Sequence, residues 1–299
     1  MLSQEVKYEL GPNIMVASDP EGRLFIEPHL TSDPTNPNRL FAVSFIDSPT
    51  PQYKNGDICA VFSSTDAGDS WTRHDLTCIS CADPWVTVTN KGLVFVTALG
   101  KHPSLPDPEI QLLVFVSSDG GLTWGDVPQS LGRYHDGTRS IAGPDGTLYI
   151  LSGQSLRDDA QNLRFSLFIG KAEPGRPHVN AFPRVFPSNL NQVSDGLALL
   201  SDGSLVITYD DFQRKANGGF RTRAGALKGR RSWAMLSEDG GQSFSMPLFL
   251  TETCWTRPTF LAVDSSGGPF QDRLYYICEG DNQRELILTY SSDRGEEWT

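Results

Sequence analysis

The 299-residue sequence lacks the marks of several protein classes. No apolar run approaches the roughly 18 residues that a membrane-spanning helix needs. The polar, acidic opening stretch has neither the basic region nor the apolar region of a secretory signal. Basic residues are also in deficit, with 25 Lys and Arg against 36 Asp and Glu and a formal net charge of −11. We therefore expect no membrane span and no nucleic-acid partner; a secreted or periplasmic location, with the signal already removed, stays open.

Motifs for metals, cofactors and common nucleophiles are missing too. The five histidines form no H-x-H or H-E-x-x-H array, and there is no serine elbow, P-loop or dinucleotide fingerprint. We expect no metal and no cofactor. Of five cysteines, only Cys78 and Cys81 form a C-x-x-C pattern, which alone is weak evidence for zinc or redox chemistry. Packing thiols or a local disulfide are the expected outcomes there, and the remaining cysteines are expected in the core, at positions 59, 254 and 278.

What the sequence does contain is one octapeptide four times over, Ser-x-Asp-x-Gly-x-x-(Trp/Phe). The copies begin at Ser64, Ser117, Ser237 and Ser291. Their aspartates stand at positions 66, 119, 239 and 293, so the middle gap is about twice the other two and hides a degenerate copy. A repeat of this length predicts a radial or solenoidal array. Serine and aspartate oxygens can accept backbone N–H groups of a tight turn, glycine supplies a positive φ, and the aromatic ring fills space between sheets.

This octapeptide resembles the Asp box, or BNR repeat, of the sialidase superfamily, and the resemblance covers nearly the whole chain. It implies a single all-β domain over residues 1–299, a β-propeller of four-stranded blades. In that family the Asp boxes lie on the face away from the ligand, so the aspartates of the motif are expected to be structural rather than catalytic.

Recurring hairpins indicate where each blade begins. Apolar strands joined at Gly, Asn or Asp turns occupy residues 83–99, 136–152 and 195–211, with looser versions at 27–45 and 257–280. The third repeat keeps its strand but replaces the octapeptide with a plain turn at residues 170–175. No helix is expected. Five repeats are visible where the family usually has six, so the chain is either a piece of a six-bladed ring or a five-bladed ring closed by an outer strand at residues 13–18.

Because strands alternate in direction, the starts of the inner strands should lie opposite the octapeptide turns, around a central channel. Acids there could supply the carboxyl pair of a glycoside hydrolase. The catalytic candidates are Asp83, Asp136 and Asp195. The candidates for binding substrate are Arg257, Glu27, His135, Asp210, Asp211 and Glu279. The alternative is that acids at strand ends, particularly before proline in Glu27-Pro28 and Asp83-Pro84, merely cap turns.

Three further features bear on the substrate. Sialidases hold the substrate carboxylate with three arginines, one of which lies in a short motif before the first strand. When Phe25-Ile26-Glu27-Pro28 is aligned with that motif, Ile26 takes the place of the arginine. This difference weakens the case for sialic acid as the substrate. Arg257 could still pair with an anionic sugar or form a structural salt bridge. The loop at residues 213–231 is rich in Arg and Lys and is either an anion-guiding lid or a solvated insertion. Trp85 and Trp255 could stack on a sugar ring or pack in the core.

The sequence therefore predicts a sialidase-like glycoside hydrolase with a glycan or anionic sugar as substrate. The alternative is a non-catalytic propeller that binds glycan or protein. Oligomeric state is not predicted.

Overall fold

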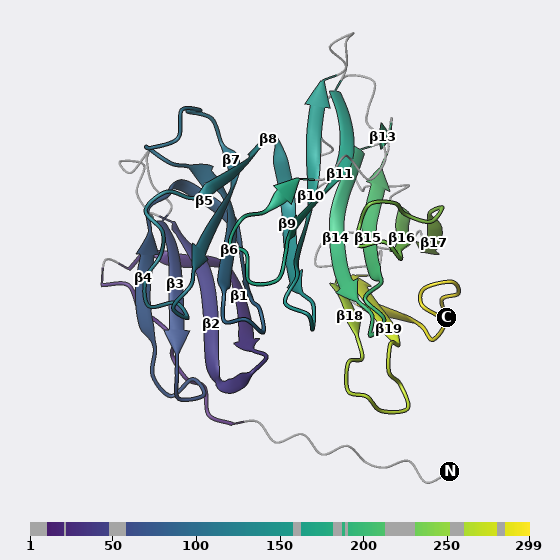
Figure 1. The fold of residues 1–299 in the computed structure, drawn as a ribbon, viewed down its shortest axis with the longest axis horizontal. Helices are drawn as coiled ribbons and strands as arrows, with labels where there is room; N and C mark the ends of the chain where they lie inside the picture. The colour runs from purple at the N-terminus through teal and green to yellow at the C-terminus, as the bar shows by residue number, and fades with distance from the viewer. Residues whose placement is uncertain are drawn as a thin grey trace.

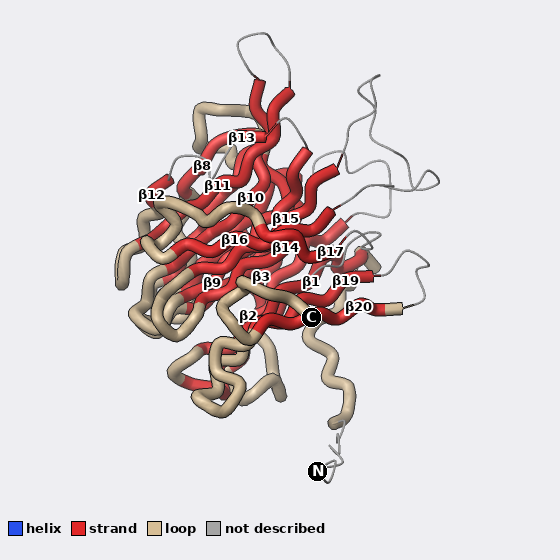
Figure 2. The backbone as a smooth tube through the Cα atoms, turned by 90° about the vertical axis from the view of Figure 1, so that its right-hand side faces the viewer, coloured by secondary structure: helices blue, strands red, loops and turns tan. Residues whose placement is uncertain are grey.

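A computed structural model describes residues 11–20, 22–47, 58–157, 163–181, 187–188, 191–212, 231–251, 260–279 and 285–299. This part of the chain is built of strands and loops and contains no helix, as expected (Figure 2). It follows that the described residues include no helix suited to crossing a membrane.

The strands form five antiparallel sheets, which we call blades 1 to 5. Blade 1 contains β1 (Leu24–Asp33), β2 (Asn36–Asp47), β3 (Ile58–Ser64) and β4 (Thr72–Leu76). Blade 2 contains β5 (Ile79–Val88), β6 (Val94–Lys101), β7 (Gln111–Ser117) and β8 (Gln129–Arg133). Blade 3 contains β9 (His135–Ala142), β10 (Leu148–Arg157), β11 (Leu163–Ala172), β12 (Asn180–Ala181) and β13 (Pro187–Ser188). Blade 4 contains β14 (Asn191–Leu199), β15 (Leu205–Phe212), β16 (Arg231–Ser237) and β17 (Leu248–Thr251). Blade 5 contains β18 (Phe260–Val263), β19 (Leu274–Glu279) and β20 (Leu286–Ser291).

The blades follow one another in chain order across the molecule (Figure 1). The first strand of each blade contacts the first strand of the next, in the sequence β1, β5, β9, β14 and β18, so these are the inner strands. The predicted blade starts at Glu27, Asp83, Asp136 and Asp195 all fall in inner strands; Arg257 lies outside the described residues.

Apolar side chains from neighbouring blades meet to form the core. Between blades 1 and 2, Val43 and Val61 pack with Val86 and Val96, all fully buried. A second cluster joins blades 3 and 4, and a third joins blades 4 and 5. Each strand turns alternate side chains to its two faces, so a sheet between two others is apolar on both faces.

The four octapeptides form the same turn. Ser64 Oγ accepts the Gly68 amide at 2.9 Å and donates to Asp66, whose Oδ1 accepts the Ser70 amide at 2.9 Å. Gly68 has a φ of 97°, and the indole of Trp71 donates to its carbonyl at 2.9 Å. Hydrogen bonds from the Ser70 side chain and amide lower the pKa of Asp66 to about 2. The aspartate is thus held in its turn, which confirms the structural interpretation of the motif.

The serine and aspartate bonds recur in the other three octapeptides, and the indole bond recurs at Trp298. The Ser117, Ser237 and Ser291 hydroxyls each accept the glycine amide four residues later at 2.8 Å. The third repeat lacks the serine and aspartate and makes a plain turn, but β11 continues to Ala172, so the turn begins later than the predicted residue 170 and is closed by the Arg176 amide on the Glu173 carbonyl.

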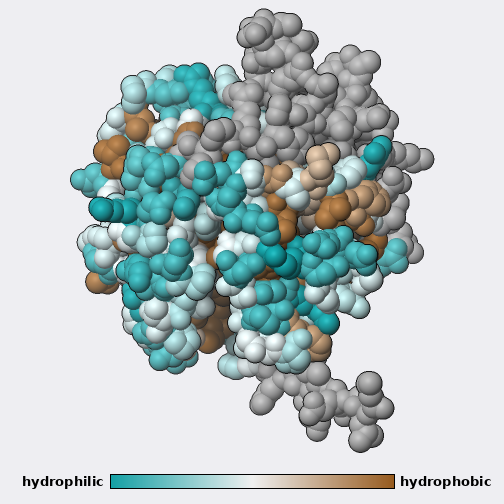
Figure 3. Space-filling model, turned by 45° about the vertical axis from the view of Figure 1, so that its right-hand side comes forward, coloured by the Kyte–Doolittle hydropathy of each residue, from teal (hydrophilic) through white to brown (hydrophobic). Residues whose placement is uncertain are grey.

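One prediction about the ends of the array is wrong. Residues 13–18 do not form a strand; Ala17 instead packs beside Phe25 and Phe62 on the outer side of blade 1. The blade 5 sheet leaves apolar side chains uncovered, with Leu286 at 71% and Leu288 at 56% exposure. Hydrophobic residues gather on this side of the molecule (Figure 3). In the described part of the chain no sheet joins blade 1 to blade 5.

The cysteines pair differently from the prediction. Cys81 forms a disulfide with Cys59 of blade 1, not with Cys78, and their Cα atoms are 5.5 Å apart. Cys78 is half-buried, and its thiol lies 3.9 Å from the Ile79 carbonyl oxygen. Cys59 and Cys278 are fully buried, as expected, but both are in disulfides. The disulfide between Cys59 and Cys81 links β3 to β5 and so ties the first two blades covalently.

Candidate functional site

The inner strands of blades 1 to 4 carry their acids at irregular points of the β-ladder. Pairing registers shift beside Glu27, Asp83 and Asp195, and β9 shifts against β10 near Asp136. The backbone has a positive φ at Glu27 (53°), Asp83 (46°) and Gly137 (63°). Left-handed backbone at a non-glycine residue is unfavourable by roughly 1–3 kcal/mol and persists where the surroundings enforce it.

Hydrogen bonds between blades hold the backbone in this conformation. The Asp83 amide donates to Glu27 Oε2 at 2.8 Å, and the Gly137 amide donates to Asp83 Oδ2 at 3.3 Å. The Ser194 hydroxyl then donates to the Gly137 carbonyl at 2.5 Å. A chain of bonds therefore runs across the starts of four inner strands. It brings Glu27, Asp83 and the residue before Gly137, Asp136, to neighbouring positions.

These three acids differ in exposure. Glu27 and Asp136 are exposed, and Asp83 is half-buried between them. Each of Glu27 and Asp83 has one oxygen on a neighbouring backbone amide. Carboxyl groups therefore lie at the surface on adjacent strands. Acid–base chemistry requires carboxyl groups that a substrate can reach in this way.

Two of the three predicted acids of blade 4 are buried instead. Asp195 is 2% exposed and Asp210 is fully buried. Asp210 Oδ1 accepts the Ser232 hydroxyl at 2.6 Å, and Ser232 Oγ accepts the Tyr276 hydroxyl at 3.1 Å. This chain links blade 4 to blade 5, because Tyr276 belongs to β19. Neither acid has a side chain at the surface beside Asp83.

The remaining predicted substrate-binding residues are scattered. His135 is 7% exposed, and its ring meets Phe168 edge-on with centroids 4.8 Å apart. Burial lowers the pKa of His135 to about 4. Glu279 ends β19, half-buried, opposite Leu286. Arg257, Trp255, the side chain of Asp211 and the basic loop at 213–230 lie outside the described residues.

Trp85 has neighbours on both sides that the sequence did not reveal. The His29 ring stacks on it, with centroids 3.6 Å apart and planes 24° apart, and the Arg139 guanidinium lies 4.6 Å from its centroid. His29 belongs to blade 1 and Arg139 to blade 3, the blades that flank Trp85. Partners from both neighbouring blades therefore contact the half-buried indole, and packing between blades accounts for its position.

This stack also sets the charge state of His29. Burial, and secondarily the positive charge of Arg139, lower the pKa of His29 to about 4. Its Nδ1 accepts the Val86 amide at 3.3 Å, which fits a neutral ring. Alignment of the repeats would have found the stack, because His29, Trp85 and Arg139 each follow the inner-strand acid by two or three residues.

A narrow cavity continues from the stack along the inner strands. Its volume is about 280 Å³, and His29, Trp85, Thr87 and Ser140 contribute to its lining. The Thr87 and Ser140 hydroxyls lie 2.7 Å apart, and the Ser140 carbonyl accepts the Trp85 indole N–H at 3.0 Å. Polar groups on neighbouring blades therefore satisfy one another inside the channel.

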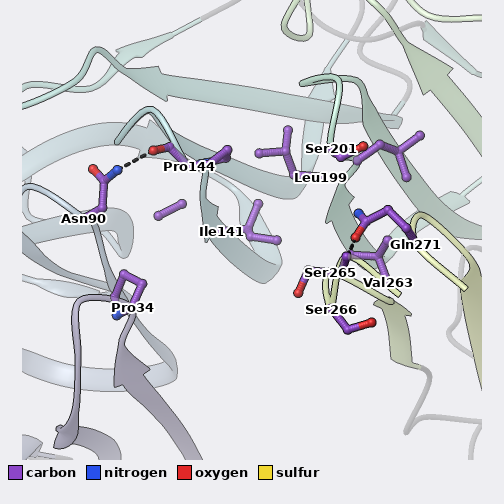
Figure 4. A pocket seen from close by; sticks show the side chains of 14 residues that line it. Pro34, Asn90, Ile141, Pro144, Leu199, Ser201, Val263, Ser265, Ser266 and Gln271 are labelled. Carbon is purple, nitrogen blue, oxygen red and sulfur yellow. Dashed lines mark hydrogen bonds between the residues drawn. The ribbon is translucent and has the colours of Figure 1, made fainter. Parts of the chain in front are cut away.

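A larger cavity, of about 600 Å³, lies at the opposite end of the inner strands (Figure 4). Turns from all five blades line it, including Pro34, Asn90, Pro144, Ser201 and Ser266. The Asn90 side chain donates to the Pro144 carbonyl across the gap between blades 2 and 3. Its described lining holds no acidic, basic or histidine side chain. The larger cavity thus offers no acid–base group, and the candidate site stays with the inner-strand acids.

Metal ligands do not gather at this site. Among the described residues, the cluster that could hold a metal consists of Cys59, Cys78 and Cys81, and none of the candidate acids belongs to it.

Solved structures share the overall fold. No protein-family model matches the sequence, and no curated protein sequence matches it. A Hadza microbial sialidase is 18% identical, with a TM-score of 0.61, over 92% of this chain and 57% of that one. The chain thus spans less than two thirds of that enzyme. An α-L-arabinanase from Penicillium chrysogenum, complexed with arabinobiose, is 15% identical over 96% of this chain and 84% of that one, with a TM-score of 0.60. An α-L-arabinofuranosidase from Fusarium graminearum is 15% identical over 94% and 82%, with a TM-score of 0.58. At these identities the likeness establishes fold alone: the chain has the all-β fold of the sialidase-like propeller enzymes.

Proposed function

We propose that the protein is a glycoside hydrolase in which Asp83 and Asp136 form the carboxyl pair. The observation that carries the proposal is the chain of inter-blade hydrogen bonds, which holds Glu27, Asp83 and Gly137 in a fixed row at the starts of the inner strands. The structural neighbours that act on sugars, a sialidase, an arabinanase and an arabinofuranosidase, support the reaction class by analogy of fold.

The two acids have environments suited to different roles. Asp83 is half-buried and lies between the other two acids, where it can meet the leaving-group oxygen of a bound sugar, so we assign it as the general acid. Asp136 is exposed, so water can reach it, and we assign it as the base or nucleophile. Glu27 positions Asp83, because its carboxylate accepts the Asp83 amide.

The substrate is a glycan, and sialic acid is not singled out. Ile26 stands where the related motif has an arginine. Arabinan oligosaccharides therefore belong in the same screen as sialosides, uronides and neutral glycosides.

The test is a hydrolysis screen followed by substitution. Asp83→Asn and Asp136→Asn should each lower kcat by about 10²- to 10⁴-fold, the usual contribution of an acid–base group. Asp126→Asn is the matched control, since Asp126 is an exposed acid in the loop after an octapeptide turn, at the other end of the blade. Wild-type turnover with both site variants fully active would refute the assignment of the pair.

A second candidate function is non-catalytic glycan binding. It is favoured by the engagement of Glu27 and Asp83 with backbone amides of the next blade, a bond that stabilises the fold without chemistry. Calorimetric binding of an oligosaccharide that the protein does not hydrolyse over a day, at high enzyme concentration, would support this candidate against the first.

A further inference from the structure

An exposed tyrosine forms the corner between blades 2 and 3. Tyr134 joins β8 to β9 and is 62% exposed. It is followed by the buried His135 and then by the exposed Asp136. In an extended strand two residues span about 7 Å. The Tyr134 side chain therefore belongs to the same end of the inner strands as the proposed carboxyl pair, although the sequence did not predict it as a site residue.

The backbone at Tyr134 is in an unfavourable conformation. Its φ is 67°, in the left-handed region that bulky side chains rarely adopt. Blade 2 has a left-handed residue at the matching place, since Ser80 lies three residues before the positive φ of Asp83. Tyr134 likewise lies three residues before the positive φ of Gly137. Both blades adopt this conformation, and a small residue is enough for it in blade 2, so the turn itself does not explain a tyrosine.

Contacts on both sides fix the corner. The Tyr134 carbonyl accepts the Ser155 amide of β10 at 2.8 Å. Arg133 forms an ion pair with Asp107, in the connection between β6 and β7. Hydrogen bonding to Asp107, and secondarily to the Tyr134 side chain, raises the pKa of Arg133. The phenol is thus in contact with a guanidinium that is itself held in place.

The next residue anchors the corner from inside. The His135 ring packs edge-on against Phe168, with centroids 4.8 Å apart. Its Nε2 lies 3.3 Å from the Leu131 carbonyl oxygen and 3.2 Å from the Gln154 side-chain nitrogen. A side chain on such a rigid support loses little conformational entropy when a ligand binds to it. Backbone strain held by rigid surroundings is typical of functional sites.

We propose that Tyr134 is a stacking platform for a neutral sugar ring of the substrate, an inference that rests on the glycan function proposed for the acids beside it. One face of a sugar ring carries mainly C–H groups, which pack on the flat apolar face of an aromatic ring while the sugar hydroxyls stay hydrated. Tyrosine supplies such a face with only two rotatable bonds, so little entropy is lost on binding.

The charges around the corner favour a neutral sugar. The charge of Arg133 is balanced by its ion pair with Asp107. The carboxylate of an acidic sugar stacked on the tyrosine would also lie close to Asp136, and like charges repel. The platform therefore adds affinity for neutral sugar units and none for an acidic group.

The test measures binding and turnover separately, with arabinobiose, lactose and sialyllactose as probes. Calorimetry gives the Kd of each, and initial rates give KM and kcat for any probe that is hydrolysed. Tyr134→Ala should raise the Kd or KM of a neutral probe about 3- to 10-fold, the size of an aromatic stacking contact, and leave kcat within about 2-fold. Tyr134→Phe keeps the ring and should stay within about 2-fold of wild type in all three quantities.

Two further variants separate a binding role from a structural one. Tyr290→Ala is the matched control, because Tyr290 is 40% exposed and directly precedes the fourth octapeptide, at the other end of its blade. It should bind each probe as wild type does. Tyr134→Gly should lose affinity as the alanine variant does, yet its urea midpoint should not fall, because glycine adopts a φ of 67° without strain. A lower midpoint with unchanged affinity would overturn the proposal.

The outcomes also distinguish the platform from the proposed hydrolase. Hydrolysis of a neutral probe with the same KM in wild type and Tyr134→Ala would overturn the platform and leave the hydrolase standing. Binding without hydrolysis, weakened in Tyr134→Ala, would support the platform and count against the hydrolase. Failure of wild type to bind or hydrolyse any of the three probes would overturn the platform.

Discussion

Acidification from pH 8 to pH 5 should destabilise the folded protein through two histidines, His29 and His135. Burial lowers the pKa of both to about 4. In the unfolded chain a histidine titrates near 6.5. Between these values the unfolded state binds more protons than the folded state, so the free energy of unfolding falls as the pH falls through 6.5 and levels off near pH 4.

The size of the effect follows from the two pKa values. Protonation of one histidine multiplies the equilibrium constant for unfolding at pH 5 by (1 + 10^1.5)/(1 + 10^−1), which is about 30. This factor is equivalent to about 2 kcal/mol for each histidine. This figure applies in full to His135, which is 7% exposed, and is an upper bound for His29, which is half-buried. The pair should therefore account for about 3–4 kcal/mol of lost stability. The carboxylates of the octapeptide turns contribute little to the change in stability between pH 8 and pH 5, because the pKa of Asp66 and of Asp239 is about 2.

Urea unfolding at several pH values, followed by tryptophan fluorescence, measures the effect. In His29→Gln and in His135→Gln the loss between pH 8 and pH 5 should be about half that of the wild type, since each variant keeps one titrating ring. The double variant should be nearly insensitive over this range. If the single and double variants lose as much stability as the wild type does, the assignment of these two neutral rings is wrong.

Three other outcomes are expected from urea unfolding at pH 7. Gly121→Ala should lower the free energy of unfolding by about 2 kcal/mol or more, because Gly121 has a φ of 86° and a Cβ there would lie 2.6 Å from the Phe41 ring. Its control is Gly125→Ala, where a Cβ would meet nothing within 4 Å, and this change should alter the free energy of unfolding by no more than about 0.5 kcal/mol. Ser237→Ala should cost about 1–3 kcal/mol, since it leaves a buried glycine amide without its acceptor. Replacing Cys59 with serine should cost about 3 kcal/mol by the loop-entropy model for a separation of 22 residues, and unchanged stability would contradict that tie.

The sequence was sufficient for features that one repeat contains within itself. Ser64, Asp66 and Gly68 make their turn from bonds internal to the motif, so the octapeptide predicted it four times over. The inner strands β1 and β5 were likewise found from hairpin spacing, although they begin at Leu24 and Ile79, before the predicted starts at Glu27 and Asp83.

Contacts between repeats were not predictable in this way. Cys81 pairs with Cys59 because β5 packs against blade 1, and nothing in the C-x-x-C pattern shows that neighbour. The burial of Asp195 depends on how its strand, β14, packs against the strands of the neighbouring blades. Bulges add a further obstacle, since one extra residue reverses the face of every side chain that follows.

The tie between Cys59 and Cys81 also sets how the molecule would yield under mechanical load. A force applied through the two ends of the chain would meet a covalent crosslink between β3 and β5 in the first two blades, and blade 5 also carries a disulfide-bonded cysteine, Cys278. The chain from Cys59 to Cys81 would stay looped, so a single-molecule extension trace would fall short of the full contour length by that stretch until a reductant was added.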